Sequence, residues 1–335
     1  MVFSNLNSMR LLVTGASGFV GRGLLPFLAA HGVNGIATGR ETPTGLPAGW
    51  NGATRTAVLD GTTDTGPVDA VVHLEVKQHV PRPTAADETE FDHVNVGGTR
   101  EWLDWASRRG MGRFVFLSTI KAVASAPAPQ TEAALLRPNT PYGRSKAAAE
   151  RLVREWAAAE RSRQGVILRP APVYGPGNEA NLAAFVRQIV AGKPCLIGRG
   201  ETEKSVVSRT NLAAAIAFAA AHTAPGCEVY NVADRDTFTL AALARLIAEL
   251  AGAPTPKSIP ASLAAAAAPA GDLLERLTGR EFPLTTARLR AIRETSVFPC
   301  DKLMAAGFVH PQSTRDGLAE MLAWTNHGGQ NPPLQ

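Results

Sequence analysis

A tyrosine and a lysine stand four positions apart in the segment NTPYGRSKAAAERL, residues 139–152. The Asn-Thr-Pro sequence before the tyrosine is typical of a helix start, so Tyr142 and Lys146 should lie on the first turns of a helix. Residues four apart share one helix face, where a lysine ammonium would lower the pKa of the phenol and prepare it to exchange a proton. The alternative is a partly exposed ring beside a solvated lysine. The pair is therefore a candidate acid/base site that the rest of the chain has to support.

Three glycines follow the first apolar segment at a spacing of three, in VTGASGFVG, residues 13–21. Gly15, Gly18 and Gly21 separate a predicted strand from a predicted helix. Glycine permits a tight turn and a close approach of the backbone to a pyrophosphate, and a helix N-terminus favours the anion. Glycine also marks plain turns, but its place between a strand and a helix predicts a dinucleotide-binding loop.

The end of the second predicted strand, IATGRE, residues 36–41, bears on which dinucleotide binds. An acidic residue there would bind a free ribose 2′-hydroxyl, whereas an arginine accommodates a 2′-phosphate. Gly39 and Arg40 occupy these positions, and Arg22 after the glycine loop could add a second positive charge. The sequence therefore favours NADP(H) over NAD(H). In the alternative, Arg40 is a solvated surface residue and Glu41 binds the ribose.

Strand-like and helix-like segments alternate through the first half of the chain. Short apolar segments predict strands at residues 10–15, 35–39, 56–60, 69–75, 113–118 and 165–170. Helical patterns lie at residues 18–32 and 88–110 and continue from Pro141. The alternation predicts an α/β fold, a Rossmann-type doubly wound parallel sheet covered on both faces.

Beyond Pro170 the sequence is richer in loops and helices, which predicts a smaller, mostly helical C-terminal substrate-binding lobe. The dinucleotide-binding domain comprises residues 1–170 and about 204–233, and the lobe about 171–203 and 234–325. A short strand at residues 228–233 is expected to return to the sheet. Residues 326–335 are polar and contain Pro and Gly, as expected of a loose tail.

The composition is that of an ordinary globular chain: 335 residues, 45% hydrophobic and 19% charged. The net charge of +5 comes without a run of basic residues interleaved with aromatic ones, so we expect no nucleic-acid partner. A diffuse positive charge also suits an anionic small substrate.

The three cysteines, Cys195, Cys227 and Cys300, are scattered, which predicts neither a disulfide framework nor a metal site. The N-terminal segment is not a secretory signal, and the longest apolar stretches fall short of the ~20 residues of a bilayer crossing. We therefore expect a cytoplasmic protein without a membrane partner.

The glycine loop, the Tyr142/Lys146 pair and the segment LRPAPVYGPGN at residues 168–178 make the chain resemble the extended short-chain dehydrogenase/reductases. This group is the NAD-dependent epimerase/dehydratase family. The resemblance runs from about Arg10 to Trp324. Within the family, the chain most resembles the branch of UDP-sugar 4-epimerases and 4-ketoreductases. The segments that carry this closer resemblance are HVPRPTAADETEFDHVNVGGT, RFVFLSTIKAV, PYGRSKAAAE and EKSVVSRTNLAAA.

The resemblance implies a role for each motif. Tyr142 is the catalytic acid/base, and Lys146 orients the nicotinamide ribose and lowers the tyrosine pKa. Thr119, with Ser118 beside it, supplies the hydroxyl that hydrogen-bonds the reacting sugar oxygen. Asp60 matches the acid that contacts adenine. The implied cofactor-binding residues are Gly15, Ser17, Gly18, Phe19, Val20, Gly21, Arg40, Asp60, Leu74, Asn95, Tyr142 and Lys146.

On the substrate side, Asn181 and Lys204 match positions that hold the diphosphate, and Thr119 and His79 complete the implied substrate site. The alternatives for Asn181 and Lys204 are a helix-start residue and a solvated charge. One of three further arginines could contact a phosphate; these are Arg288, Arg290 and Arg293.

Two departures from the family pattern matter. Glu75 stands where a small residue usually faces the cofactor, and it either points away or narrows the nicotinamide pocket. Ile120 and Lys121 follow Thr119 where the dehydratase branch carries an Asp-Glu pair, which argues against 4,6-dehydration.

Three functions stay open. The first is an NAD(P)-dependent 4-epimerase of a nucleotide-diphosphate sugar, which returns the hydride to the other face of the sugar. The second is an NADPH-dependent 4-ketoreductase of a keto-sugar or small ketone, which consumes its cofactor. The third is a non-catalytic dinucleotide-binding sensor, although such proteins tend to lose the tyrosine or the lysine that this chain retains.

The helical segments 90–108 and 142–156 resemble the pair with which many relatives form a four-helix dimer interface, so we expect a homodimer. Trp102 and Trp105 could lie in that interface or in the core.

Overall fold

The computed structural model describes residues 6–326 except 79, 81–82, 124–125, 127, 179–180, 223–225, 280–281 and 283. A seven-stranded sheet lies at its centre, in the order β11-β6-β5-β4-β1-β2-β3, and all neighbouring strands are parallel. Its strands are β1 Arg10–Thr14, β2 Asn34–Gly39, β3 Trp50–Thr54, β4 Ala70–His73, β5 Arg113–Leu117, β6 Gln164–Pro170 and β11 Gly226–Val232. The predicted Rossmann-type sheet is confirmed, including the returning strand β11.

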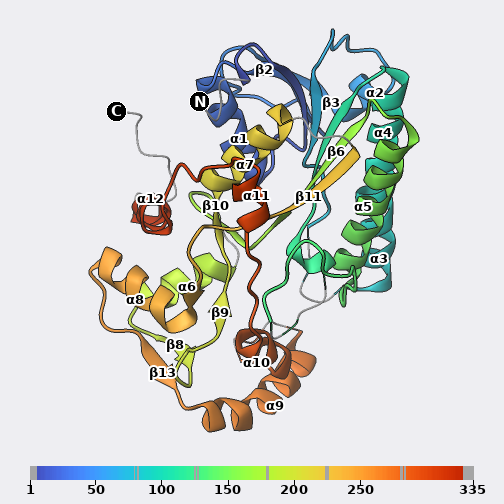
Figure 1. The fold of residues 1–335 in the computed structure, drawn as a ribbon. Helices are drawn as coiled ribbons and strands as arrows, with labels where there is room; N and C mark the ends of the chain where they lie inside the picture. The colour runs from blue at the N-terminus through green and yellow to red at the C-terminus, as the bar shows by residue number, and fades with distance from the viewer. Residues whose placement is uncertain are drawn as a thin grey trace.

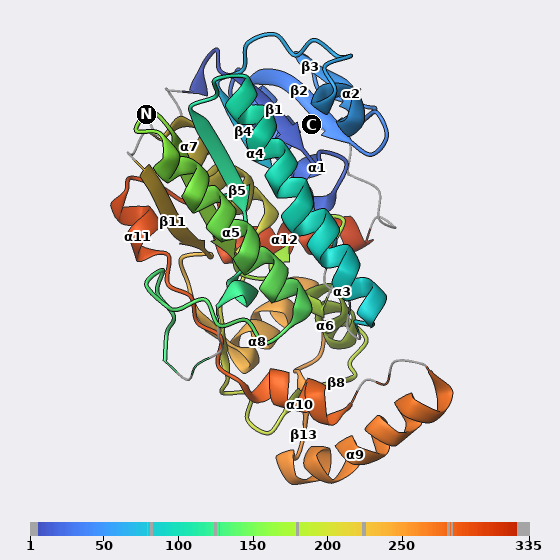
Figure 2. The same ribbon diagram turned by 90° about the vertical axis from the view of Figure 1, so that its right-hand side faces the viewer.

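Helices cover both faces of this sheet (Figure 1). Helices α1 (Phe19–Ala30) and α7 (Arg209–Ala221) pack on one face. On the other face, α4 (Gly98–Arg108) and α5 (Pro141–Ala159) run side by side (Figure 2). Alternate residues of β1 enter the two cores, Leu11 and Val13 on one side and Leu12 on the other. The strand is buried on both faces, which explains its continuous apolar sequence.

Shorter elements complete this domain. They are α2 Arg55–Leu59, α3 Ala85–Phe91, the π-helix η2 Asp92–Gly97, the 3₁₀ helix η3 Ile120–Ala122 and α11 Asp301–Ala305. The single helical pattern predicted for residues 88–110 is thus built from α3, η2 and α4 in succession.

The second lobe lies below the sheet in Figure 1 and has its own core, formed mainly by three helices. Its helices are α6 Asn181–Val190, α8 Leu240–Ala251, α9 Ala261–Thr278, α10 Thr286–Arg293 and α12 Thr314–Asn326. Three two-stranded sheets accompany them: β7 Val173–Tyr174 with β10 Val207–Ser208, β8 Pro194–Ile197 with β13 Lys257–Ile259, and β9 Glu203–Lys204 with β12 Phe238–Thr239.

The strand predicted at residues 56–60 is wrong. Those residues belong to α2 and its C-cap, and the strand is β3, immediately before them. Thr54 caps the helix by accepting a hydrogen bond from the backbone N–H of Ala57. Strand β3 is at the sheet edge and buries only Trp50 and Ala53, so its sequence carries little of the apolar pattern that marks a strand.

The predicted domain bounds stay predictions. Leu303 and Phe308 come from the segment assigned to the lobe, but they pack into the core that α1 and α7 form with the central sheet. Most of the predicted tail, residues 327–335, lies outside the described residues. No helix among the described residues is long and apolar enough to span a membrane.

Candidate active site

The glycine loop joins β1 to α1 through a left-handed turn at Gly15, whose φ is +64°. A Cβ on Gly15 would lie 2.7 Å from the backbone nitrogen of Glu75, so only glycine fits where the glycine loop meets the backbone after β4. Helix α1 begins without a side-chain cap and without an acidic residue in its first turn. Its first N–H groups are thus open to an anion, which fits the pyrophosphate of a dinucleotide.

The end of β2 lies against this loop. A Cβ on Gly39 would be 3.1 Å from the Ser17 hydroxyl, and the side chain of Arg40 is exposed beside it. The structure thus brings Ser17, Gly39 and Arg40 together at the carboxyl edge of the sheet. The preference for NADP(H) that Arg40 suggests remains a prediction.

Asp60 lies farther from this edge than the sequence predicts, because the short helix α2 separates it from the end of β3. Its carboxylate accepts hydrogen bonds from the N–H and the hydroxyl of Thr62, which lower its pKa. Thr54 and Arg55 directly follow the strand instead. A contact of Asp60 with adenine therefore stays a prediction.

Two adjacent hydroxyls at the end of β5 point in opposite directions. The hydroxyl of Ser118 donates to the Glu150 carboxylate at 2.6 Å and is buried. The side chain of Thr119 instead hydrogen-bonds Tyr142. Successive strand residues face opposite sides, and this favours Thr119 over Ser118 as the hydroxyl beside the reacting atoms.

Helix α5 places Tyr142 in its first turn and Lys146 one turn further on. Thr140 fixes the helix start by accepting a hydrogen bond from the N–H of Gly143. Lys146 is 2% exposed, and its ammonium lies 4.0 Å from the ring centroid of Phe116 on β5. The two predicted residues therefore lie at the same end of the helix, and Lys146 contacts the strand that ends two residues before Thr119.

The pKa values differ from the expectation of a lowered tyrosine. Burial raises the pKa of Tyr142 to about 12, and its hydrogen bond with Thr119 offsets part of that rise. Burial lowers the pKa of Lys146 to about 7, and the nearby Glu150 carboxylate opposes this shift. Desolvation is the larger effect at both groups, at Lys146 because it is almost fully buried and at Tyr142 although its side chain is only partly buried.

A buried ion pair lies behind the site and was missed at the sequence level. Arg169 on β6 donates two hydrogen bonds to Glu150, at 2.9 and 2.7 Å, and both side chains are almost fully buried. Since Glu150 also binds Ser118, the pair joins α5, β5 and β6. The position of Glu150, four residues after Lys146 on the same helix face, could have indicated it.

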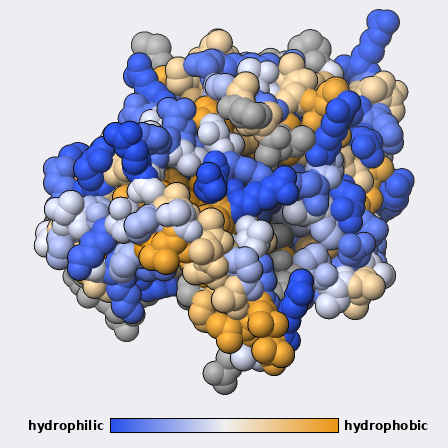
Figure 3. Space-filling view, turned by 90° about the horizontal axis from the view of Figure 1, so that it is seen from below, coloured by the Kyte–Doolittle hydropathy of each residue, from blue (hydrophilic) through white to orange (hydrophobic). Residues whose placement is uncertain are grey.

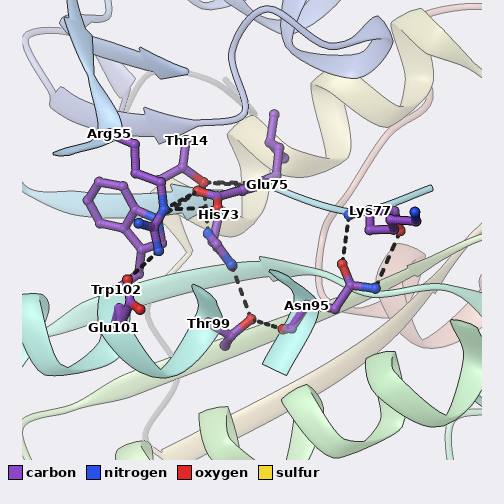
Figure 4. A network of polar contacts seen from close by, with 10 residues as sticks. Thr14, Arg55, His73, Glu75, Lys77, Asn95, Thr99, Glu101 and Trp102 are labelled. Atoms are coloured by element: carbon purple, nitrogen blue, oxygen red, sulfur yellow. Dashed lines mark hydrogen bonds and ion pairs between the residues drawn. The ribbon is translucent and has the colours of Figure 1, made fainter. Parts of the chain in front are cut away.

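Asn95 connects the same helix to the loop after β4. It lies in η2, where its amide oxygen accepts from the Lys77 N–H at 2.8 Å and its nitrogen donates to the Ser145 hydroxyl at 2.9 Å. Figure 4 shows the bonds between Asn95 and Lys77. Asn95, 1% exposed, therefore fixes the distance between the β4 loop and the Tyr142 helix.

Glu75 points away from the sheet edge, toward α2 and α4 (Figure 4). Its carboxylate accepts from Arg55 at 2.9 and 3.2 Å and from the indole N–H of Trp102 at 3.0 Å. Arg55 also pairs with Glu101. Of the two possibilities that the sequence left open, the structure has Glu75 turned away into this network.

His73 lies beneath the network and is fully buried. Its ring nitrogens bond the hydroxyls of Thr14, at 2.7 Å, and Thr99, at 3.2 Å (Figure 4). Burial and the nearby cations Lys146 and Arg55 hold its pKa well below the usual range. The imidazole is therefore neutral and links β1, β4 and α4.

The predicted substrate residues are described only in part. His79 lies outside the described residues, and Asn181 begins α6. Lys204 donates to the backbone carbonyls of Ala291, at 2.9 Å, and Glu294, at the C-terminus of α10. The ammonium thus stabilises a helix end in the lobe, which competes with the predicted diphosphate contact.

One further cation near the glycine loop was not identified from the sequence. Arg209 starts α7. Its guanidinium carbon lies 5.4 Å from the centroid of the Phe19 ring, and its side chain packs against Gly23. Burial lowers its pKa, the Glu320 carboxylate opposes this shift, and Arg22 adds to it. Arg22 and Arg209 thus both bring positive charge to the region of α1, where Glu320 offsets part of it.

Comparisons with known proteins agree with this geometry. Residues 11–233 match the model of the NAD dependent epimerase/dehydratase family. The N-acetyl-α-D-glucosaminyl-diphospho-ditrans,octacis-undecaprenol 4-epimerase of Escherichia coli O157:H7 is 28% identical over 260 residues, 76% of this chain and 77% of that protein. The GDP-6-deoxy-D-mannose reductase of Pseudomonas aeruginosa is 31% identical over 261 residues, 73% of this chain and 81% of that protein. The structure of MoeE5 in complex with UDP-glucose and NAD has a TM-score of 0.72 at 25% identity, and the match covers 96% of this chain and 100% of that one.

Proposed function

Because the chain belongs to the NAD-dependent epimerase/dehydratase family of extended short-chain dehydrogenase/reductases, we propose that it is a 4-epimerase of a nucleotide-diphosphate sugar. The hydrogen-bonded hydroxyls of Thr119 and Tyr142, with Lys146 buried one turn beyond, are the observation that carries this proposal. A bound nicotinamide would accept the hydride from C4 of the sugar and return it. The open N-terminus of α1 is the place for its pyrophosphate.

The side chains of this chain would handle the proton of the C4 hydroxyl. Tyr142 takes that proton as the alcohol becomes a ketone and gives it back when the opposite alcohol forms. Thr119 donates a hydrogen bond to the C4 oxygen as its charge changes. Lys146 supplies positive potential to the phenol, and Asn95 holds the loop and the helix in register.

The alternative reaction is a single reduction of a 4-keto-sugar with NADPH. One observation favours it. Arg40, exposed at the end of β2, suits a 2′-phosphate. The relative from Pseudomonas aeruginosa is a GDP-6-deoxy-D-mannose reductase.

The carrier of the sugar diphosphate is a separate question from the reaction at C4. The relative from Escherichia coli acts on a sugar diphosphate borne by undecaprenol. An exposed apolar face on α9 of the lobe favours a lipid carrier here as well. We therefore place polyprenol-linked sugars beside nucleotide-linked ones as candidate substrates.

Product analysis separates these possibilities. The full chain is incubated with UDP-glucose, UDP-GlcNAc, their 4-keto derivatives and undecaprenyl-diphosphate GlcNAc, each with and without NADPH or NADH. Formation of a 4-epimer without net cofactor consumption supports the epimerase, and stoichiometric consumption supports the reductase. If no substrate is converted but dinucleotide binding is retained, the result would favour the non-catalytic sensor. Tyr142→Phe is the matched inactive control.

A further inference from the structure

Helix α9 carries a second apolar face whose side chains are exposed. At 100° per residue, Leu263, Leu273, Leu274 and Leu277 fall in one sector together with Ala266, Ala267 and Ala270. All seven are exposed, and the leucines at 263, 273 and 277 are 59%, 56% and 73% exposed. We call these seven residues the leucine stripe. The space-filling view from below shows hydrophobic residues gathered on the underside of the molecule, where α9 lies in Figure 1 (Figure 3).

The opposite face of α9 fixes the direction in which the stripe points. Ala264 and Ala268 pack against Leu289 of α10. A Cβ on Gly271 would lie 1.8 Å from the Leu284 carbonyl oxygen, so the helix touches the loop before α10 directly. Two acids add to this contact: Asp272 accepts from the N–H of Thr286 at 3.1 Å, and Glu275 from that of Phe282 at 2.6 Å. The helix therefore cannot turn the stripe inward without breaking these contacts.

The charges around the stripe favour an anionic surface over a second copy of the chain. Residues 254–296 contain six basic and four acidic side chains. The described acids are engaged within the lobe, Asp272 and Glu275 as above and Glu294 with Arg290. Arg276 on α9, Lys257 on β13 just before it and Arg293 at the end of α10 are exposed. Two copies of this positively charged part of the lobe would repel each other in a symmetric pair, whereas its cations attract anionic lipid head groups.

We propose that α9 lies in the interface of an anionic bilayer, with the leucine stripe in the acyl boundary and the arginines at the head groups. Its length, 18 residues, corresponds to about 27 Å along the membrane plane. The sequence has no segment long enough to span a bilayer and for that reason predicts no membrane partner, but an interfacial helix needs no such segment. Docking would bring the lobe to a substrate whose carrier is a lipid. That use of the docking rests on the proposed function, whereas the docking itself does not.

Vesicle sedimentation of the full chain without substrate tests the docking. Phosphatidylcholine vesicles with and without phosphatidylglycerol are compared for the wild type, for the stripe variant Leu273→Glu/Leu277→Glu and for a matched control, Ala261→Glu/Ala265→Glu. The control adds the same two charges to exposed positions of α9 outside the stripe. We expect the wild type to bind the anionic vesicles and the stripe variant to bind at least about tenfold more weakly, because two leucines no longer enter the interface. The control should stay within about threefold of the wild type.

Three results would overturn the inference: no binding of the wild type to anionic vesicles, equal loss in both variants, or a smaller oligomer in the stripe variant by sedimentation velocity. The last result would show that a second copy covers the stripe. Thermal unfolding shows whether each variant is folded. Turnover of a water-soluble UDP-sugar reports on the proposed function alone, so docking and catalysis fail or succeed separately.

Discussion

The Tyr142 phenol carries its proton at neutral pH, as an ordinary tyrosine does, and burial raises its pKa further, to about 12. The group can therefore donate a proton directly but must be helped to accept one. The hydroxyl of Thr119 is hydrogen-bonded to the phenol, and Lys146 lies one turn further along α5. Sequence spacing predicts that these side chains meet, but it does not predict the pKa direction, because burial is decided by the strand and helices that enclose them.

Replacing Tyr142 by phenylalanine should lower turnover by about 10²–10⁴-fold, the contribution of a positioned acid/base. The ring that packs edge-on against Phe91, with centroids 6.1 Å apart, is retained, so the fold should be unchanged. Steady-state turnover and dinucleotide affinity are measured together. A variant with near-normal turnover would show that another group moves the proton.

Lys146 should make stability depend on pH in a defined direction. Its pKa falls from 10.5 in the unfolded chain to about 7 in the folded one. Between these values the unfolded chain binds the extra proton, so the wild type gains stability as pH rises. Below about pH 7 the folded protein bears the full cost of a buried ammonium.

In Lys146→Met this cost is absent, so the stability gained by the substitution should be largest near pH 6 and should shrink toward pH 9.5. Urea unfolding of both proteins across this range gives the difference directly. A difference that stays constant with pH would mean that the lysine keeps its ordinary pKa in the folded protein.

At the scale of elements, the loop after β4 is fixed by side chains that arrive from other parts of the chain. Glu75 binds Arg55 after β3 and Trp102 on α4. The sequence identifies Glu75 as unusual but does not reveal its partners, which lie 20 and 27 positions away. The Glu150–Arg169 pair was missed for the same reason, since it forms only when α5 packs on β6.

Glu75→Gln should lower the free energy of unfolding by about 1–3 kcal/mol, because the partly buried Arg55 and the indole of Trp102 lose the carboxylate that both bind, and only the exposed Glu101 still pairs with Arg55. Glu101→Gln is the matched control. Glu101 also pairs with Arg55 but is 51% exposed, so its loss should cost within about 1 kcal/mol. Urea unfolding measures both, and equal effects would show that the network does not depend on Glu75.

The sheet itself was the most predictable part of the molecule. Strands buried on both faces, such as β1 and β6, are continuous apolar segments and are recognised directly. The edge strand β3 is not, because most of its residues face solvent and the capped helix α2 follows without a break. The error placed the strand end at Asp60 instead of Thr54, and so misplaced the residues that lie near the expected adenine position.

At the scale of the whole molecule, two surfaces could contact partners, the α4–α5 face and the leucine stripe on α9. Trp102 and Trp105 do not contribute to the first one. They are 0% and 3% exposed, and their indole N–H groups bond Glu75 and the Val58 carbonyl. The exposed residues of α4 and α5 are mostly charged: Arg100, Glu101, Asp104, Arg108, Arg144, Arg151 and Glu155.

A dimer through α4 and α5, which the family resemblance suggests, would therefore depend on exposed ion pairs and should dissociate as salt rises. Asp104→Arg should weaken it several-fold by adding positive charge to a face that already has four exposed arginines. Asp236→Arg, the same change at an exposed lobe position, is the control and should leave association unchanged. Sedimentation velocity at low and high salt measures each protein. A salt-resistant dimer that Asp104→Arg leaves intact would place the interface elsewhere, and because the leucine stripe is the apolar alternative, its double variant should then become monomeric.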